Sequence, residues 1–230
     1  MEKKFSKNKI RRIDLHTHSL LSDGELLPSE IVRYAEFLNY EAIAVTDHVD
    51  ASNIDSVLSK LTKASDELKK FSIKTRFLVG VELTHIPPKS IPSMALKARK
   101  LGAELVIVHG ETLVEPVKAG TNHEAVKCGD VDILAHPGLI SFEDCELARE
   151  NNVYLELTLR KGHCLTNGYL VKMALKAGAK LLLNTDLHSP EDFISQEEAF
   201  KAAIGAGLSE KEALKVLREN PRELIKKCKT

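Results

Sequence analysis

Short apolar runs and longer amphipathic stretches alternate along the whole chain. The apolar runs are rich in Val, Ile and Leu and are nearly continuous, which is typical of parallel strands that are buried on both faces. We predict seven such strands, over residues 13–16, 41–46, 76–82, 104–109, 131–135, 153–159 and 180–186.

The amphipathic stretches have the periodicity of helices that cover a sheet. We predict helices over residues 28–39, 52–70, 91–101, 122–128, 141–151, 167–177, 196–206, 209–219 and 222–227, the last two separated by Pro221. Each strand is followed by a helix, so the count suggests a closed β/α barrel one unit short of the usual eight. A doubly wound parallel sheet is the alternative, because it has the same local pattern.

Composition places the chain among ordinary globular proteins. It has 230 residues, 43% of them hydrophobic, which suffices for one domain with a substantial core. The 33 basic and 33 acidic side chains balance, so the whole molecule has no field that attracts nucleic acid or membranes. There is no apolar stretch of spanning length, no signal-peptide segment, and no metal-ligand spacing among the four cysteines. We therefore predict a cytoplasmic protein with a single domain over residues 1–230.

Residues 1–12 form a basic N-terminal arm, because residues 3–12 contain several Lys and Arg side chains and no acidic one. Short charge runs are usually solvated. The arm also leads into the start of the first strand, at the end of a barrel opposite to its active site. We interpret it as a solvated arm, with contact to nucleic acid as the alternative.

Side chains that bind metals gather at the C-terminal ends of the predicted strands. The first strand ends in His16 and His18, which are two residues apart and therefore lie on the same side of it. The remaining candidates are Asp23, His48, Glu82, His109, His136, Asp186 and His188. A single buried histidine is more often a hydrogen-bonded core residue, but nine such groups at one end of a barrel point to a cation.

Six short motifs carry these side chains: DLHTHSLLSDG (14–24), VTDH (45–48), GVE (80–82), VHG (108–110), AHPG (135–138) and TDLHS (185–189). With this ordered set the chain resembles the polymerase and histidinol phosphatase (PHP) family over essentially its whole length. The resemblance implies a distorted, TIM-like (β/α)7 barrel of parallel strands, with a di- or trinuclear metal site that hydrolyses phosphate esters.

The resemblance also implies how the ligands divide among two to three divalent ions of zinc, manganese or iron. The first ion would take His16, His18, Glu82 and Asp186. The second would share Glu82 as a bridge and take His109 and His136, and the third would take Asp23, His48 and His188. All nine positions carry competent ligands, which argues against an inactive copy.

The charge of such a centre suits a phosphate substrate. Three divalent cations, three carboxylates and a hydroxide that bridges two metals leave a net charge of about plus two, which matches a phosphate monoester dianion. Water bound to zinc ionises with a pKa of about 7. We predict in-line attack by the metal-bridging hydroxide, held by the ligands of the first two ions, with the metals stabilising the phosphoryl oxygens. No general acid for the leaving group is evident.

Candidates for substrate contact lie in the loops after the strands. Arg160, at the end of the sixth strand, could pair two phosphate oxygens at once; the alternative is a surface arginine. Lys161 and His163 follow in the same loop and have weaker claims. His85, three residues after Glu82, is either a substrate contact or a loop histidine without metal.

Other polar residues are expected to support the site. Glu156 could orient a ligand histidine through the free ring nitrogen of that histidine, and we interpret Asp47 as structural. The long loop after the fourth strand could select the leaving group through Glu111, Thr112, Asn122 and His123. For His123, which begins a predicted helix, a capping or surface role is favoured.

We predict a phosphoesterase that hydrolyses a small-molecule phosphate monoester, in the manner of a histidinol phosphatase. The compact length leaves little room for the inserted domain that nuclease-like relatives carry, so nucleic acid is not favoured as a partner. The alternatives are a nuclease or nucleotide phosphoesterase of the same family, and a non-catalytic PHP module in a protein complex. Amidohydrolases resemble the chain less, because they have eight strands and a carboxylated lysine where the fourth run here ends in His109.

Overall fold

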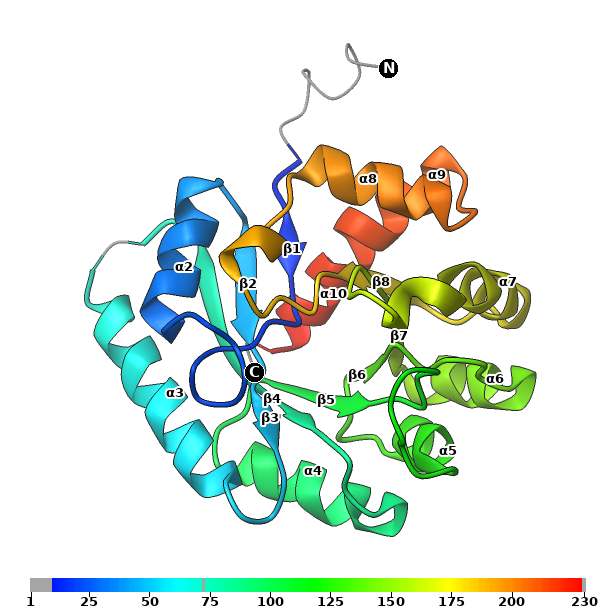
Figure 1. Cartoon of the computed structure of the whole chain (residues 1–230), viewed down its shortest axis with the longest axis horizontal. Coiled ribbons are helices and arrows are strands. Elements are labelled where there is room, and N and C mark those ends of the chain that lie inside the picture. Colours follow the sequence, from blue (N-terminus) through cyan, green and yellow to red (C-terminus); the bar gives the residue numbers. More distant parts are fainter. Residues whose placement is uncertain (1–9, 72, 229–230) are drawn as a thin grey trace.

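The computed structural model describes residues 10–71 and 73–228, and its strands follow one another around a nearly closed parallel barrel (Figure 1). The strands are β1 (Ile13–Asp14), β2 (Ala42–Val45), β3 (His48–Val49), β4 (Arg76–Leu83), β5 (Leu105–His109), β6 (Ile133–Ala135), β7 (Tyr154–Thr158) and β8 (Leu181–Asn184). Most of the predicted basic arm, residues 1–9, lies outside the described residues.

The segments β2 and β3 are two parts of one strand. Both pair in parallel with β4, and the pairs Val45↔Val79 and His48↔Glu82 continue the same register. Counted in this way, the described residues form a barrel of seven strands, and every pairing between neighbouring strands is parallel. The predicted seven-stranded barrel is confirmed.

The barrel closes between β1 and the end of β8, which distinguishes it from a doubly wound sheet. Closure comes from a parallel bridge between Thr17 and Leu187, assisted by side chains. The buried carboxylate of Asp14 accepts a hydrogen bond of 2.8 Å from the Thr185 hydroxyl and pairs with Arg12 at 3.0 Å. Because polar side chains supply much of this contact, the barrel is distorted rather than evenly hydrogen-bonded.

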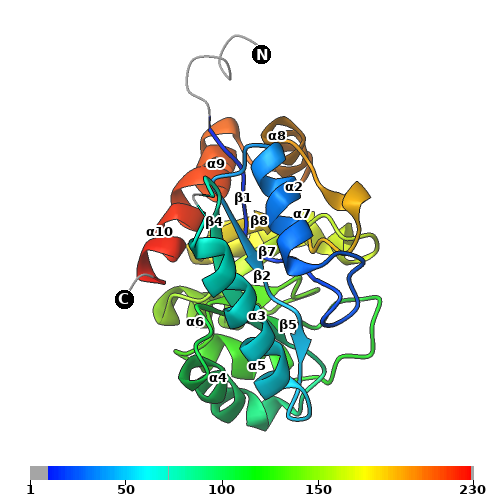
Figure 2. The same ribbon diagram turned by 90° about the vertical axis from the view of Figure 1, so that its left-hand side faces the viewer.

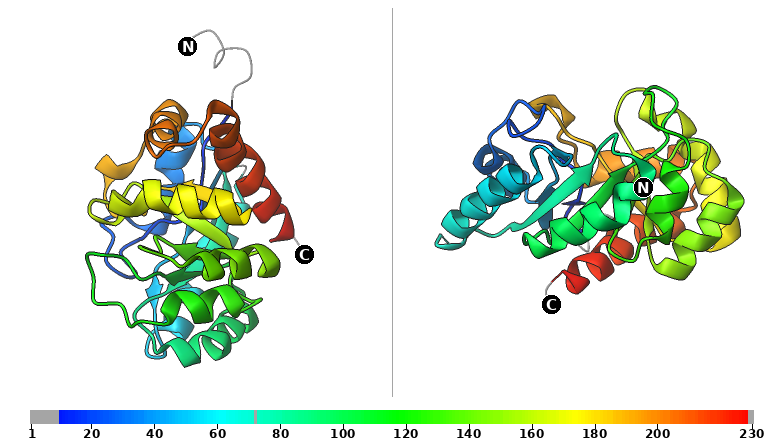
Figure 3. Two further views of the ribbon diagram at one scale, coloured as in Figure 1. Left: turned by 90° about the vertical axis from the view of Figure 1, so that its right-hand side faces the viewer. Right: turned by 90° about the horizontal axis from the view of Figure 1, so that it is seen from below.

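Helices surround the barrel on the outside, as the side views show (Figures 2 and 3). They are α2 (Pro28–Phe37), α3 (Ile54–Lys69), α4 (Ile91–Lys100), α5 (Thr121–Lys127), α6 (Phe142–Asn151), α7 (Asn167–Ala177), α8 (Gln196–Gly205), α9 (Glu210–Leu214) and α10 (Asn220–Lys227). One apolar core lies between the helices and the strands. A second fills the barrel, where Leu224 and Ile225 of α10 pack among strand residues such as Ile13 and Leu78. The helix α10 therefore closes the end of the barrel at which the strands begin.

The predicted break at Pro221 is wrong. Instead, a π-helical turn over Lys215–Glu219 joins α9 to α10, and Pro221 lies in the first turn of α10. Proline has no N–H and its ring clashes with the carbonyl four residues earlier. The wider π turn just before it accommodates both effects without ending the helical path.

The other predicted helices are present, with ends that differ by up to a few residues. Across residues 10–71 and 73–228, none of the helices combines the length and the apolar character that crossing a membrane requires.

Candidate metal centre

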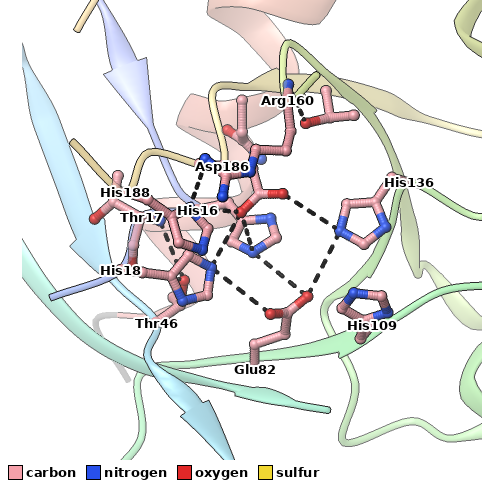
Figure 4. A network of polar contacts seen from close by, with 12 residues as sticks. His16, Thr17, His18, Thr46, Glu82, His109, His136, Arg160, Asp186 and His188 are labelled. Carbon is pink, nitrogen blue, oxygen red and sulfur yellow. Dashed lines mark hydrogen bonds and ion pairs between the residues drawn. The ribbon is translucent and has the colours of Figure 1, made fainter. Parts of the chain in front are cut away.

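The pair His16 and His18 occupies the centre of the mouth formed by the C-terminal ends of the strands (Figure 4). Both side chains are fully buried. Nδ1 of His16 lies 2.9 Å from Oε2 of Glu156, which also accepts a hydrogen bond of 2.8 Å from Asn184. This contact leaves His16 Nε2 facing the two carboxylates of the site, at 3.4 Å from Glu82 and 3.6 Å from Asp186. Glu156 thus contacts His16 as expected of an orienting residue.

Glu82 and Asp186 face each other between the histidines (Figure 4). Glu82 is the last residue but one of the long strand β4, and its oxygens lie 3.7 Å from His18 Nε2 and 2.7 Å from His48 Nδ1. Asp186 follows β8 with a φ of 56°, and its Oδ1 lies 3.2 Å from His18 Nε2. A left-handed aspartate backbone is uncommon and costs free energy, so the fold holds this carboxylate in place against local strain.

Asp23 brings His48 and His188 together at the outer side of His18. Its two oxygens lie 3.4 Å from His48 Nε2 and 3.3 Å from His188 Nε2. The ring of His18 stacks against the ring of His48 and against that of His188, with centroids 4.2 and 4.3 Å away. The three residues that the family resemblance assigns to one ion are thus adjacent, and one ion could also reach His18.

His109, the last residue of β5, and His136, which follows β6, lie on the opposite side of Glu82. Nε2 of His136 is 3.8 Å from Glu82 and 3.6 Å from Asp186, so one ion could be held by His16, Glu82 and His136. The donor atoms of His109 and His136 also converge with that of His163. The backbone of His136 has a φ of 28°, a second strained position at the mouth.

The described residues fit a cluster of divalent cations. Several buried atoms at the centre form no hydrogen bond of acceptable geometry among these residues, even where a carboxylate oxygen lies as near as 3.2 Å: His16 Nε2, both ring nitrogens of His18, Glu82 Oε1 and His136 Nδ1. Polar atoms that are buried without a partner are costly, and a cation that accepts their lone pairs removes this cost. Imidazole nitrogens and carboxylate oxygens are the donors that zinc, manganese and iron bind.

The electrostatics of the site keep its carboxylates ionised. Burial alone raises the pKa of Glu82, but His16 and His48 outweigh burial and hold that pKa well below its usual value. Asp186 behaves likewise, because His16 and His18 overcome its burial and lower its pKa. Burial lowers the pKa of His18 to about 4. Burial alone lowers the pKa of His48, but Glu82 and Asp23 outweigh burial and raise it to about 10, and Glu156 and Glu82 likewise raise the pKa of His16. The carboxylates and His18 can therefore bind a cation as they stand, whereas His16 and His48 must first lose a proton.

The candidates for substrate contact lie at the rim. Arg160 is 36% exposed, its backbone N–H donates to Thr158 Oγ1 at 3.1 Å, and its guanidinium is 3.8 Å from Asp192. Figure 4 shows its side chain on the Asp186 side of the cluster. Lys161 is exposed. His85 is also exposed, and its Nε2 lies 3.0 Å from Glu115.

The other predicted support residues lie outside the cluster. Asp47 accepts hydrogen bonds from the backbone and hydroxyl of Ser19, both at 2.7 Å, and so fixes the loop after β1. Glu111 accepts from the backbone of Asn122 at 2.9 Å, and Thr112 is buried in the same loop. Nδ1 of His123 lies 2.7 Å from Asp144, on the outer helices.

Sequence reasoning missed one residue of the site and undervalued another. The carboxylate of Glu115, in the loop between β5 and α5, lies within 3.2 Å of His85, His109 and His163. His163 had only a weak claim as a substrate contact. Neither residue belongs to a motif or to a strand end, so no spacing in the sequence indicates that the two loops meet.

Comparisons with known proteins agree with this geometry. A model of the PHP domain matches residues 14–110. The uncharacterized protein MJ1295 of Methanocaldococcus jannaschii is 54% identical over 216 residues, which cover 94% of this chain and 99% of that protein. Ribonuclease P protein component 3 of Methanosarcina mazei is 26% identical over 220 residues, covering 89% of this chain and 85% of the relative.

Among solved structures, a chain in a cryo-EM structure of archaeal ribonuclease P with mature tRNA has a TM-score of 0.67 and 18% identity. The match covers 95% of this chain and 90% of that one. At this identity the likeness concerns the fold.

Proposed function

Because this chain belongs to the PHP domain family, whose members are typically metal-dependent hydrolases, we propose that it is a phosphoesterase acting on a small-molecule phosphate monoester. One observation carries the proposal. Nine potential ligands from six of the seven strands and their loops converge at one mouth of the barrel. Several buried ligand atoms among them form no hydrogen bond with the described residues. A merely structural cluster of histidines and carboxylates leaves those atoms unsatisfied.

Divalent cations bound here would supply a nucleophile from water near neutral pH and neutralise charge on the phosphoryl oxygens. The residues of the chain then have separate tasks. Glu156 orients His16 through its Nδ1, so that Nε2 faces the centre at 3.4 Å from Glu82. Glu82 and Asp186 place two negative charges between the histidines, which favours the binding of cations there.

The surroundings of the mouth support a small substrate. The loop between β5 and α5 reaches across to the loop after β7, where Glu115 contacts His163 at 3.2 Å and Val114 packs against Gly162. This contact covers one side of the cluster. A compact monoester fits such a mouth more easily than a polynucleotide backbone does, and histidinol phosphate is one candidate.

Arg160 is proposed to hold the phosphate. Arg160→Ala should weaken catalysis by about one to two powers of ten, since a charge-assisted contact contributes roughly 1.5–3 kcal/mol. The loss should be larger for a monoester dianion than for a diester, and Arg160→Lys should recover only part of it. Steady-state kinetics with metal analysis measure this effect.

Lys172→Ala, which removes an exposed charge from the outer helix α7, is the matched control for Arg160. Metal content should be the same in both variants. Equal kinetics for the wild type and Arg160→Ala on the best substrate would place Arg160 outside the substrate site.

A screen of phosphate esters tests the substrate class. Phosphate release should be measured from histidinol phosphate, sugar phosphates, nucleoside monophosphates, cyclic phosphodiesters and a short single-stranded oligonucleotide. We expect a monoester to dominate. Dominance of the oligonucleotide would reject the monoesterase in favour of a nuclease.

The relationship to ribonuclease P protein component 3 favours a second candidate function, a role with RNA. Under this reading the chain binds a structured RNA or a protein complex that contains one. The complete set of nine ligands is the observation that places hydrolysis first. Binding of tRNA at physiological salt, together with no turnover of any ester, would favour the RNA role.

A further inference from the structure

Two loops bring additional ligand-type side chains to the mouth, beyond the nine at the strand ends. The loop between β5 and α5 carries Glu115, and the loop after β7 carries His163 in a short 3₁₀ turn, His163–Thr166. Glu115 Oε1 lies 3.2 Å from His163 Nε2, and its Oε2 lies 3.2 Å from His109 Nε2 and 3.0 Å from His85 Nε2. One carboxylate is therefore surrounded by three imidazoles, which come from the end of β5 and from the loops after β4 and β7.

The position of His163 is fixed by its surroundings. Its side chain is 7% exposed, and its ring packs edge-on against that of His136, with centroids 4.4 Å apart. The preceding Gly162 has a φ of 87°, a left-handed conformation that turns the chain back toward the barrel. A side chain at this position would be strained and would meet Val114. The turn therefore requires glycine, and it directs His163 inward.

The loop that carries Glu115 is also held in place by hydrogen bonds. Glu111 Oε1 accepts hydrogen bonds from the backbone of Gly120 and of Asn122, both at 2.9 Å. The side chain of Asn122 in turn donates to the Pro137 carbonyl at 2.8 Å, which ties the loop to the turn after β6. Glu115 is 38% exposed, so it lies at the border between the cluster and solvent.

The donor atoms here have the separations of a ligand shell. In a tetrahedral zinc site with bonds of about 2.0–2.2 Å, neighbouring donor atoms lie roughly 3.4 Å apart. The distances from Glu115 to His109 and His163, both 3.2 Å, are close to that value. In addition, the ligand atoms of His109, His136 and His163 all lie within 4.8 Å of one another, as do those of His85, His109 and Glu115.

We propose that His163 is a tenth metal ligand, which binds the same ion as His109 and His136, and that Glu115 closes the solvent-facing side of that ion. The inference rests on the metal centre of the proposed function and extends it. The affinity for one of the ions then depends on these two loops as well as on the ligands at the strand ends. The alternative is that Glu115 forms ion pairs with protonated histidines and that no metal binds there. An experiment must distinguish the metal site from these ion pairs.

Metal titration of the full chain decides between these readings. Protein stripped of metal is titrated with Zn²⁺ and, separately, with Co²⁺, whose visible absorption reports nitrogen and oxygen ligands. Bound metal per chain is counted by mass spectrometry. His163→Ala and Glu115→Gln should each weaken one equivalent by about ten- to a hundredfold or remove it, as loss of even an outer partner costs that much affinity. The remaining equivalents should be unchanged.

Matched controls come from the neighbouring helix α5, where His123→Asn and Glu124→Gln remove the same chemical groups outside the cluster. Both should bind metal as the wild type does. If His163→Ala fails to fold, the exposed Glu115→Gln decides. If Glu115→Gln and any folded His163 variant bind metal with wild-type stoichiometry and affinity, this inference is overturned, but the proposed function is not. A wild-type protein that binds no metal would reject the proposed function together with it.

Discussion

Replacing Glu82 with glutamine should lower kcat/KM for phosphate release by at least about a hundredfold and should lower the bound metal per chain. Loss of an outer hydrogen-bond partner of a ligand already costs roughly ten- to a hundredfold, and Glu82 lies inside the ligand set. Its oxygens face His16, His18, His48 and His136 within 3.8 Å. Glutamine keeps the shape of the side chain but removes the negative charge that binds cations, so the effect is electrostatic.

Glu104→Gln is the control for this variant, because Glu104 lies just before β5 and pairs with Arg76 at the opposite end of the barrel. It should retain both metal and turnover. Near wild-type rates in Glu82→Gln would show that the cluster is not the catalytic centre. Circular dichroism of both variants confirms that the barrel is intact before the rates are compared.

Asp186→Asn should produce a loss of similar size. The backbone at this position is left-handed, with a φ of 56°, and asparagine is among the few residues that tolerate this conformation. The substitution therefore keeps the turn after β8 and isolates the charge. Asp186 contacts His16, His18 and His136, so removing its charge should weaken the ion between them.

Asp66→Asn, at an exposed position of helix α3, is the control for Asp186→Asn. Metal content and turnover are measured on both proteins under the same conditions. Turnover within a factor of two or so of the wild type in Asp186→Asn would contradict a role for its charge in catalysis.

The strands and the gathering of ligands at their ends could be predicted from sequence for a simple physical reason. Parallel strands that are buried on both faces read as apolar runs, and all of them end at the same edge of the barrel. A polar side chain that follows such a run, such as Glu82 or His109, must therefore lie near the others. That inference uses only the order of the strands and their direction.

Contacts between loops could not be predicted in this way. Glu115 and His163 meet because the β5–α5 loop crosses over β6, and this depends on the hydrogen bonds of Glu111 and Asn122 and on the turn at Gly162. No periodicity encodes such an encounter. The continuous helical path through Pro221 was missed for a related reason: the π turn that accommodates the proline buries Val216 and Leu217, and no pattern in the local sequence indicates it.

The most direct test of the metal centre is the metal content of the purified protein, measured together with phosphate release before and after chelation. We predict two to three equivalents of zinc, manganese or iron per chain, with activity lost on chelation and restored when the metal is returned. A folded protein that carries no metal and hydrolyses phosphate esters at an undiminished rate would contradict the proposal.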